Sequence, residues 1–140
     1  MFVYTTEQVK QMLPLLKHYS WFVEDLFGKL ELLSDKLSSI ETEKIKDRNK
    51  KEKATHLRDS LLFYFNLIED RLFDIVIELE SMNIQICSPT FGALDIPTKS
   101  DRGKLVYICF DHSIETLDEF LCHCTEGKKK KIRLTRYLDC

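Results

Sequence analysis

The sequence predicts an α+β fold in which a long antiparallel two-helix hairpin is followed by a small antiparallel β-meander. The first part of the chain repeats apolar residues at helical spacing, in two stretches that a charged segment separates. The second part has short runs of β-branched and aromatic residues, punctuated by glycine and proline. With 140 residues, the chain is expected to form one domain over 1–140. We divide it into a helical hairpin over 5–83, a β region over 84–136 and a tail over 137–140.

The first helix is predicted to begin at Thr5, whose hydroxyl forms a capping box with Gln8. An apolar stripe with heptad spacing follows, as is typical of helices that pack lengthwise. Its members are Val9, Met12, Leu16, Tyr19, Val23, Leu26, Leu30, Leu33, Leu37 and Ile40. Pro14 lies inside the stripe. Because proline lacks an N–H and clashes with the preceding turn, we expect a kink near residues 10–14. We do not expect a break, because the apolar periodicity continues in register.

A second apolar stripe advances in steps of four and three residues, which predicts a second amphipathic helix. Its members are Leu61, Phe65, Ile68, Leu72, Ile75, Leu79 and Met82. Residues 41–53 are almost all charged, and we interpret them as a solvated turn. Asn83 is expected to end the helix, because its short side chain tolerates a left-handed backbone. The stripes then face each other in an interaction seam, defined as Val9, Leu16, Val23, Leu30, Leu37, Leu61, Phe65, Ile68, Leu72, Ile75 and Leu79.

The β region is predicted to contain short strands at residues 84–87, 105–110, 116–124 and 130–135. The run at 105–110 is the best defined, because it is apolar on both faces and partly β-branched. Pro89, Gly92 and Pro97 punctuate residues 88–103, which we therefore interpret as mainly loop. We expect a three- or four-stranded antiparallel meander that packs against the hairpin.

Composition narrows the class of protein. A formal net charge of −2 is not typical of a general nucleic-acid binder or a membrane-surface protein. No segment resembles a signal peptide, and no apolar window is long enough to span a membrane. We therefore expect a cytoplasmic protein with no membrane partner, and we interpret its five cysteines as reduced thiols.

Cysteine and histidine gather in the predicted β region, at Cys109, His112, Cys122 and Cys124. If the strands that carry them pair, these side chains converge, and thiolate and imidazole in this number suit Zn²⁺. The spacing is not that of a standard zinc motif. Two other interpretations stay open: the cysteines are small buried residues of the strands, or Cys122 and Cys124 are a redox pair.

A basic segment near the end of the chain is a second candidate site, and it consists of Lys128, Lys129, Lys130, Lys131, Arg133 and Arg136. It is suited to phosphate contacts, hence to nucleic acid. The alternatives are an anionic protein partner, or an edge strand whose lysines block pairing with another sheet. Asp111, His112 and Glu115 contain the groups of a general acid–base set, although such residues are also common in polar turns.

Two stretches resemble a bacterial and archaeal family of small proteins, domain of unknown function family 2203. The run from Thr5 through Leu16 is similar to its opening, Thr-Pro-Glu-Glu-Ala through Leu-Leu-Pro-Leu-Leu. The segments 92–97 and 103–110 are similar to its Gly-Leu-Val-Asp-Phe-Pro and Gly-Arg-Glu-Val-Tyr-Leu-Cys-Trp. Phe110 replaces the family's tryptophan, and His123 stands near the position of its later histidine. The resemblance implies a helical hairpin with a β tail and implies no particular activity.

The hairpin has more apolar surface than two helices can bury against each other. Large apolar residues lie beside the seam, namely Phe22, Phe27, Leu62, Phe63, Phe73 and Val76. We therefore expect a non-enzymatic interaction or oligomerisation module without a cofactor, either a homodimer or bound to a helical protein partner. The alternative from a different class is a metal- or thiol-dependent protein that uses the Cys/His cluster, with zinc as the metal. Nucleic-acid binding through the basic segment is a weaker alternative.

Overall fold

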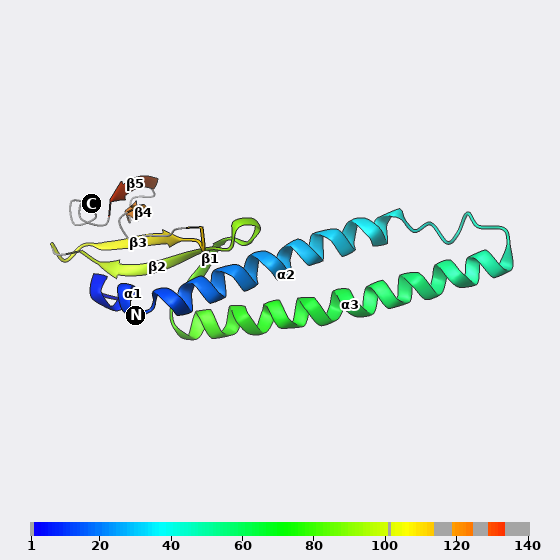
Figure 1. Ribbon diagram of the computed structural model, residues 1–140, viewed down its shortest axis with the longest axis horizontal. Helices are drawn as coiled ribbons and strands as arrows, with labels where there is room; N and C mark the ends of the chain where they lie inside the picture. The colour runs from blue at the N-terminus through cyan, green and yellow to red at the C-terminus, as the bar shows by residue number, and fades with distance from the viewer. Residues whose placement is uncertain (1, 101, 114–118, 125–128, 134–140) are drawn as a thin grey trace. The chain divides into compact units, whose positions relative to one another are not determined.

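In the residues that it describes, the computed structural model has three α-helices and five β-strands, and it confirms the α+β class (Figure 1). It describes the backbone of residues 2–100, 102–113, 119–124 and 129–133, and the side chains of residues 2–100 and 102–113. The helices are α1 (Thr6–Gln11), α2 (Leu13–Ser39) and α3 (Arg48–Ser81), with a short 3-10 helix, η1 (Pro89–Phe91). The strands are β1 (Gln85–Ser88), β2 (Ala93–Lys99), β3 (Leu105–Phe110), β4 (Glu119–Cys124) and β5 (Lys129–Arg133).

The helical hairpin consists of α2 and α3, with α1 preceding it as a separate short helix. The predicted capping box is present: the Gln8 N–H donates to Thr5 Oγ1, and the Thr5 N–H donates to Gln8 Oε1. The prediction of a kink without a break was wrong, because the helix is interrupted at Met12 and α2 begins directly after it. Pro14 thus occupies the first turn of α2, where a missing N–H leaves no helical hydrogen bond unmade.

The second long helix is capped at both ends. Asp47 Oδ1 accepts hydrogen bonds from the N–H groups of Asn49 and Lys50, so the helix starts earlier than the charged composition of this segment suggested. At the other end Asn83 has a φ of 58°, as predicted. The Ile84 N–H donates to Leu79 O and the Asn83 N–H donates to Glu80 O, which is the Schellman pattern.

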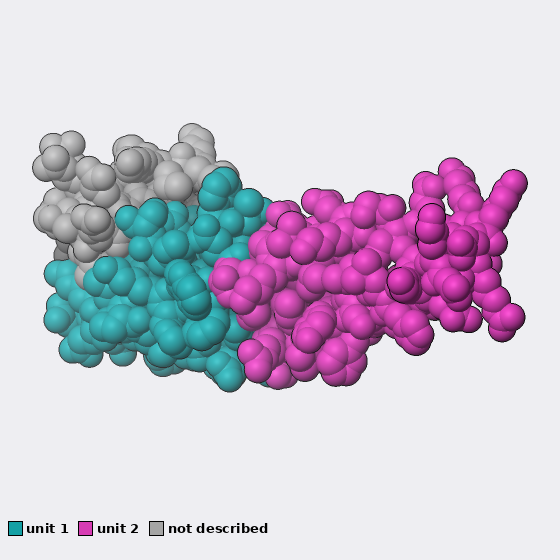
Figure 2. Space-filling model, turned by 45° about the vertical axis from the view of Figure 1, so that its right-hand side comes forward, with its two compact units in different colours: residues 1–24, 75–140 teal, residues 25–74 magenta. Residues whose placement is uncertain are grey.

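The chain consists of two compact units (Figure 2). Unit 1 comprises residues 1–24 and 75–140, and unit 2 comprises residues 25–74. Unit 1 contains the sheet, α1 and the adjoining parts of α2 and α3, whereas unit 2 is the remainder of the two long helices and their connection. No helix in the described part of the chain is both long and apolar enough to cross a membrane.

The five described strands form one antiparallel sheet in the order β1-β2-β3-β4-β5. The order confirms the predicted antiparallel meander, but the sheet has five strands where three or four were expected. The interpretation of 88–103 as mainly loop was wrong, because β2 lies within it and pairs with both β1 and β3. Pro97 obscured this strand. Its carbonyl accepts from the Tyr4 N–H, so the side of Pro97 that lacks an N–H faces away from β3 and the β2–β3 ladder loses nothing.

The core of unit 1 lies on one face of the sheet. Three register pairs between β2 and β3 are almost fully buried, namely Leu94–Phe110, Ile96–Ile108 and Thr98–Val106. Side chains from the helices and from the segments beside them complete this core: Tyr4, Val9, Leu16, Val23, Leu79 and Ile84. The alternate residues of β2 and β3, which include Asp95 and Cys109, therefore lie on the opposite face.

Candidate functional site

Three ligating side chains meet on the second face of the sheet. Cys87, Asp95 and Cys109 each offer one ligand atom, and these atoms all lie within 4.8 Å of one another. They come from three successive strands, β1, β2 and β3. Asp95 is the register partner of Cys109 across β2 and β3, so the carboxylate lies between the two thiols. No other such group occurs in the part of the chain whose side chains are described.

Cys87 lies at an irregularity in β1. Ile86 pairs with Leu94, and the next pair is Ser88 with Ala93, so Cys87 is the extra residue of a β-bulge. Bulges are frequent beside functional sites. Because Gln85 is the register partner of Asp95, ordinary strand alternation already places Cys87, two residues further on, on the same face of the sheet as Asp95.

The site is sheltered from solvent. Cys109 is 8% exposed, Cys87 and Asp95 are partly buried, and Asp95 Oδ1 is inaccessible to solvent. Sulfur and carboxylate oxygen are both ligands of Zn²⁺. This arrangement is thus chemically suited to a thiophilic divalent cation.

Of the four residues of the predicted Cys/His cluster, Cys109 and His112 have described side chains, whereas only the backbone of Cys122 and Cys124 is described. Cys109 belongs to the group just described, whereas His112 does not. In the register of β3 and β4, Cys109 pairs with Leu121, and Cys122 and Cys124 pair with Ile108 and Val106. The backbone register therefore does not place Cys122 or Cys124 opposite Cys109.

The spacing of cysteine and histidine residues along the sequence did not identify Cys87 and Asp95 as members of the site. The available signal was the polar Asp95 between the apolar Leu94 and Ile96, which is the alternation of a strand with one buried face. Because Pro97 follows so closely, that alternation resembled a loop. The bulge at Cys87 has no signature in the sequence.

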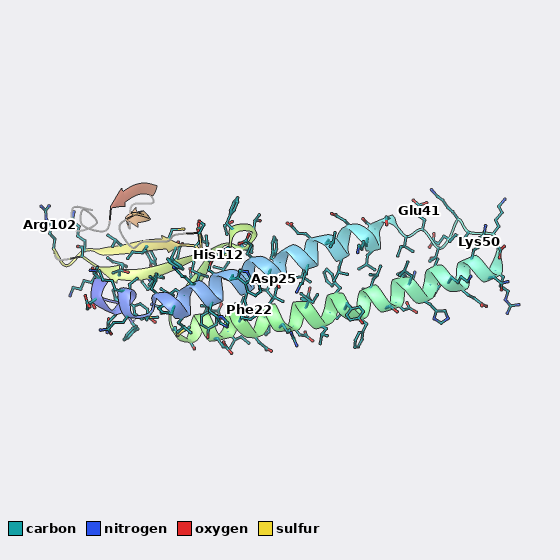
Figure 3. The ribbon with its side chains drawn as sticks, in the orientation of Figure 1. Phe22, Asp25, Glu41, Lys50, Arg102 and His112 are labelled. Atoms are coloured by element: carbon teal, nitrogen blue, oxygen red, sulfur yellow. The ribbon has the colours of Figure 1, made fainter. Side chains whose placement is uncertain are left out.

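His112 contacts the first long helix instead of a cysteine (Figure 3). Its Nε2 is in hydrogen-bonding contact with Glu24 Oε2, and its backbone N–H donates to Ser20 Oγ at 2.8 Å. Ser20 is completely buried. These contacts fasten the turn after β3 to α2. We find no feature of this arrangement that assigns it an acid–base role, and Glu115 lies outside the described residues.

The residues of the predicted interaction seam are buried to different extents in the two units. In unit 1, Val9, Leu16, Val23 and Leu79 are buried, and Ile75 is partly exposed. In unit 2, every seam member is only partly buried, namely Leu30, Leu37, Leu61, Phe65, Ile68 and Leu72. Leu26 is the one buried residue among those of unit 2. The two helices of unit 2 therefore lack a core of the kind that unit 1 has.

A second apolar surface lies on α3, away from the seam. We call it the α3 apolar face and define it as Leu57, Phe63, Tyr64 and Leu67, which are 54%, 66%, 55% and 45% exposed. Leu57 and Tyr64 are seven positions apart. Leu67 follows Phe63 by four positions and Tyr64 by three, so all of these residues lie on one side of the helix. The rings of Phe63 and Tyr64 contact each other edge to face, with centroids 5.9 Å apart. Such an exposed cluster is typical of a protein-interaction surface.

Charge is distributed unevenly along α3. Residues 48–58 contain five basic side chains and one acidic side chain, whereas residues 69–80 contain five acidic side chains and one basic side chain. Tyr64 lies near the middle of the helix, between the two charged parts. The helix is therefore electrostatically complementary to a second copy that runs in the opposite direction.

Two tyrosines in unit 1 have pKa values raised above their ordinary value of 10.0. For Tyr19, the hydrogen bond that its hydroxyl donates to Glu78 Oε2 at 2.8 Å is the main cause, and burial adds to it. For Tyr4, burial raises the pKa, and its hydroxyl donates to Met82 O at 2.6 Å. Both hydroxyls bind residues at or directly after the C-terminal end of α3, so they help to hold that end in unit 1.

Part of the basic segment lies on β5, the last strand in the sheet order. Lys129, Lys130, Lys131 and Arg133 belong to this strand, whereas Lys128 and Arg136 fall outside the described residues. The strand order is compatible with the interpretation of these lysines as edge residues.

No protein-family model, no curated protein and no solved structure matches this chain.

Proposed function

We propose that the protein is a self-association module, in which the hairpin helices of unit 2 pair with those of a second copy. The observation that carries this proposal is the contrast within α3: its seam side is only partly buried, and its α3 apolar face is 45–66% exposed. Two helices with apolar residues on both sides need a further layer of helices to exclude water from those residues. A second hairpin supplies that layer as a four-helix arrangement.

Charge favours a second copy, and it favours the antiparallel orientation. When two α3 helices run in opposite directions, the basic part of each lies beside the acidic part of the other. A parallel pair would bring like charges together, which is destabilising. Phe63 and Tyr64 then lie near the twofold axis, where aromatic side chains contribute most to an interface.

The contact surface is tested with the double variant Phe63→Glu, Leu67→Glu, because both residues are exposed and their replacement leaves the seam untouched. Burying two carboxylates in the dimer is costly, so we expect a dissociation constant at least about 100-fold higher. The matched control is Phe91→Glu, because Phe91 is 65% exposed, nearly the same as Phe63 at 66%, but lies on η1 in unit 1.

Molar mass from light scattering during gel filtration measures both variants, and circular dichroism checks that their helices remain. We expect monomers from the double variant and dimers from Phe91→Glu. If the two variants had the same mass as the parent chain, the α3 apolar face would not be the contact surface.

Orientation is tested by charge reversal on the exposed residues of α3. The change Lys50→Glu, Lys51→Glu is expected to weaken the antiparallel dimer, and Asp70→Lys, Asp74→Lys is expected to weaken it similarly. In a parallel dimer, by contrast, either change would reduce the repulsion between like charges at one end of the helix and tighten the association. A variant dimer that is tighter than the dimer of the parent chain would therefore contradict the antiparallel orientation.

A further inference from the structure

We propose that Cys87, Asp95 and Cys109 form a binding site for a thiophilic divalent cation, with Zn²⁺ as the expected ion. The proposal rests on the convergence of three ligand atoms within 4.8 Å on the second face of the sheet. It concerns unit 1 alone and is independent of self-association through unit 2.

The sheet geometry favours a metal over a disulfide between the two cysteines. Cys87 and Cys109 lie on β1 and β3, which β2 separates. Two strand spacings amount to about 9.5 Å between backbones, whereas a disulfide needs Cα atoms less than about 7 Å apart. The two thiols therefore approach each other above Asp95 without being placed to form a bond.

A bridging ion fits this spacing. Zinc binds sulfur at about 2.3 Å and carboxylate oxygen at about 2.0–2.2 Å, so ligands on one ion lie about 3–4 Å apart. The ligand atoms here are within 4.8 Å of one another before any ion draws them together. Binding of one ion therefore requires the ligand atoms to approach one another by at most about 1–2 Å.

The ligand set also suits the ion chemically. Two thiolates and one carboxylate supply three negative charges, which a divalent cation offsets in a sheltered environment where like charges otherwise repel. Hard ions such as Mg²⁺ and Ca²⁺ prefer oxygen ligands, so two sulfur donors select for a softer metal. Three protein ligands leave one tetrahedral position for water or another donor, as in catalytic zinc sites.

Titration with Co²⁺ tests the site directly, because its thiolate charge-transfer absorption reports how many sulfurs bind the ion. The experiment uses the full chain, untagged, reduced and stripped of metal with a chelator. We expect one Co²⁺ per chain with two thiolates, and stoichiometric displacement by Zn²⁺. Absence of tight binding, or a spectrum without thiolate absorption, would overturn the proposal.

Variants identify the ligands. Cys87→Ser is the most informative, because Cys87 lies at a bulge on an edge strand and its replacement is expected to leave the fold intact. We expect it to lower the thiolate absorption by about half and to weaken binding at least about 10-fold. Asp95→Asn is expected to weaken binding while both thiolate bands remain.

The matched control is Cys122→Ser, Cys124→Ser, which alters the same residue type on β4. We expect this control to bind Co²⁺ like the parent chain. The proposal fails if the control abolishes the thiolate absorption, or if Cys87→Ser retains all of it. Because these readouts do not depend on oligomeric state, their failure leaves the self-association proposal unaffected.

Discussion

Gly92 lies directly against the backbone of Ser20, so closely that a Cβ atom at position 92 would be 2.1 Å from the Ser20 carbonyl oxygen. Gly92 also has a φ of 64°, a left-handed conformation that other residues rarely adopt. Ser20 in turn accepts a hydrogen bond from the His112 backbone through its hydroxyl. One glycine thus allows the turn between η1 and β2 to approach α2, beside the contact that holds the turn after β3.

Replacing Gly92 is therefore expected to destabilise the fold. Gly92→Ala introduces both a steric clash and an unfavourable backbone conformation, and we expect the free energy of unfolding to fall by at least about 2 kcal/mol. Gly28→Ala is the control, because Gly28 lies in α2 with no atom within 4 Å of an added Cβ. That change is expected to stabilise by about 0.5–1 kcal/mol, since alanine favours the helix. Chemical denaturation measures both, and equal effects would contradict this view of Gly92.

Tyr19 is expected to make stability fall at high pH. Its pKa in the folded protein lies above the ordinary value of 10.0, mainly because its hydroxyl donates to Glu78. The stabilising contribution is thus complete below about pH 10 and is lost as the pH rises through the folded pKa. Tyr19→Phe removes the ionisable group and with it this part of the pH dependence.

The measurement is the free energy of unfolding of the parent chain and of Tyr19→Phe, from about pH 8 to about pH 11. Tyr4 has a raised pKa in both proteins, so the difference between them isolates Tyr19. We expect the parent chain to lose its advantage over the variant as the pH rises above about 10. A difference that stays constant across this range would show that the Glu78 contact does not govern the titration of Tyr19.

Asn83 is expected to stabilise the fold in two separate ways, through its backbone conformation and through its side chain. Its positive φ ends α3, and its Nδ2 donates to Phe2 O at 2.6 Å. Asn83→Ala loses both features, and we expect a cost of about 1–2 kcal/mol in the free energy of unfolding. Asn83→Gly keeps the conformation and loses only the hydrogen bond, so its cost is expected to be smaller. Equal costs for the two variants would mean that the φ of 58° contributes nothing.

Local signals in the sequence predicted the helical part of the fold well. Heptad spacing predicted the hairpin, and side-chain chemistry predicted the capping box at Thr5 and the end of α3 at Asn83. These features depend on neighbouring residues, so a single sequence contains them. Pro14 also indicated an irregularity near Met12, but the prediction was a kink within one helix, whereas the structure has two helices.

Strand pairing was harder to predict, because it depends on residues that are far apart in the sequence. Pro97 disguised β2, and only the position of Tyr4 shows why a proline is tolerated there. The candidate metal site shows the same difficulty. Cys109 was placed on a strand, as the structure has it, but its neighbours Cys87 and Asp95 come from other strands through a register that spacing does not encode.

Sedimentation equilibrium of the reduced, full-length chain tests the central claim most directly. If the hairpins pair, the molar mass at micromolar concentration is near twice the 16.6 kDa of one chain and falls toward that value on dilution. Added salt is expected to weaken the association, because opposite charges on α3 contribute to it. A mass of 16.6 kDa at every concentration would contradict self-association through the helices of unit 2.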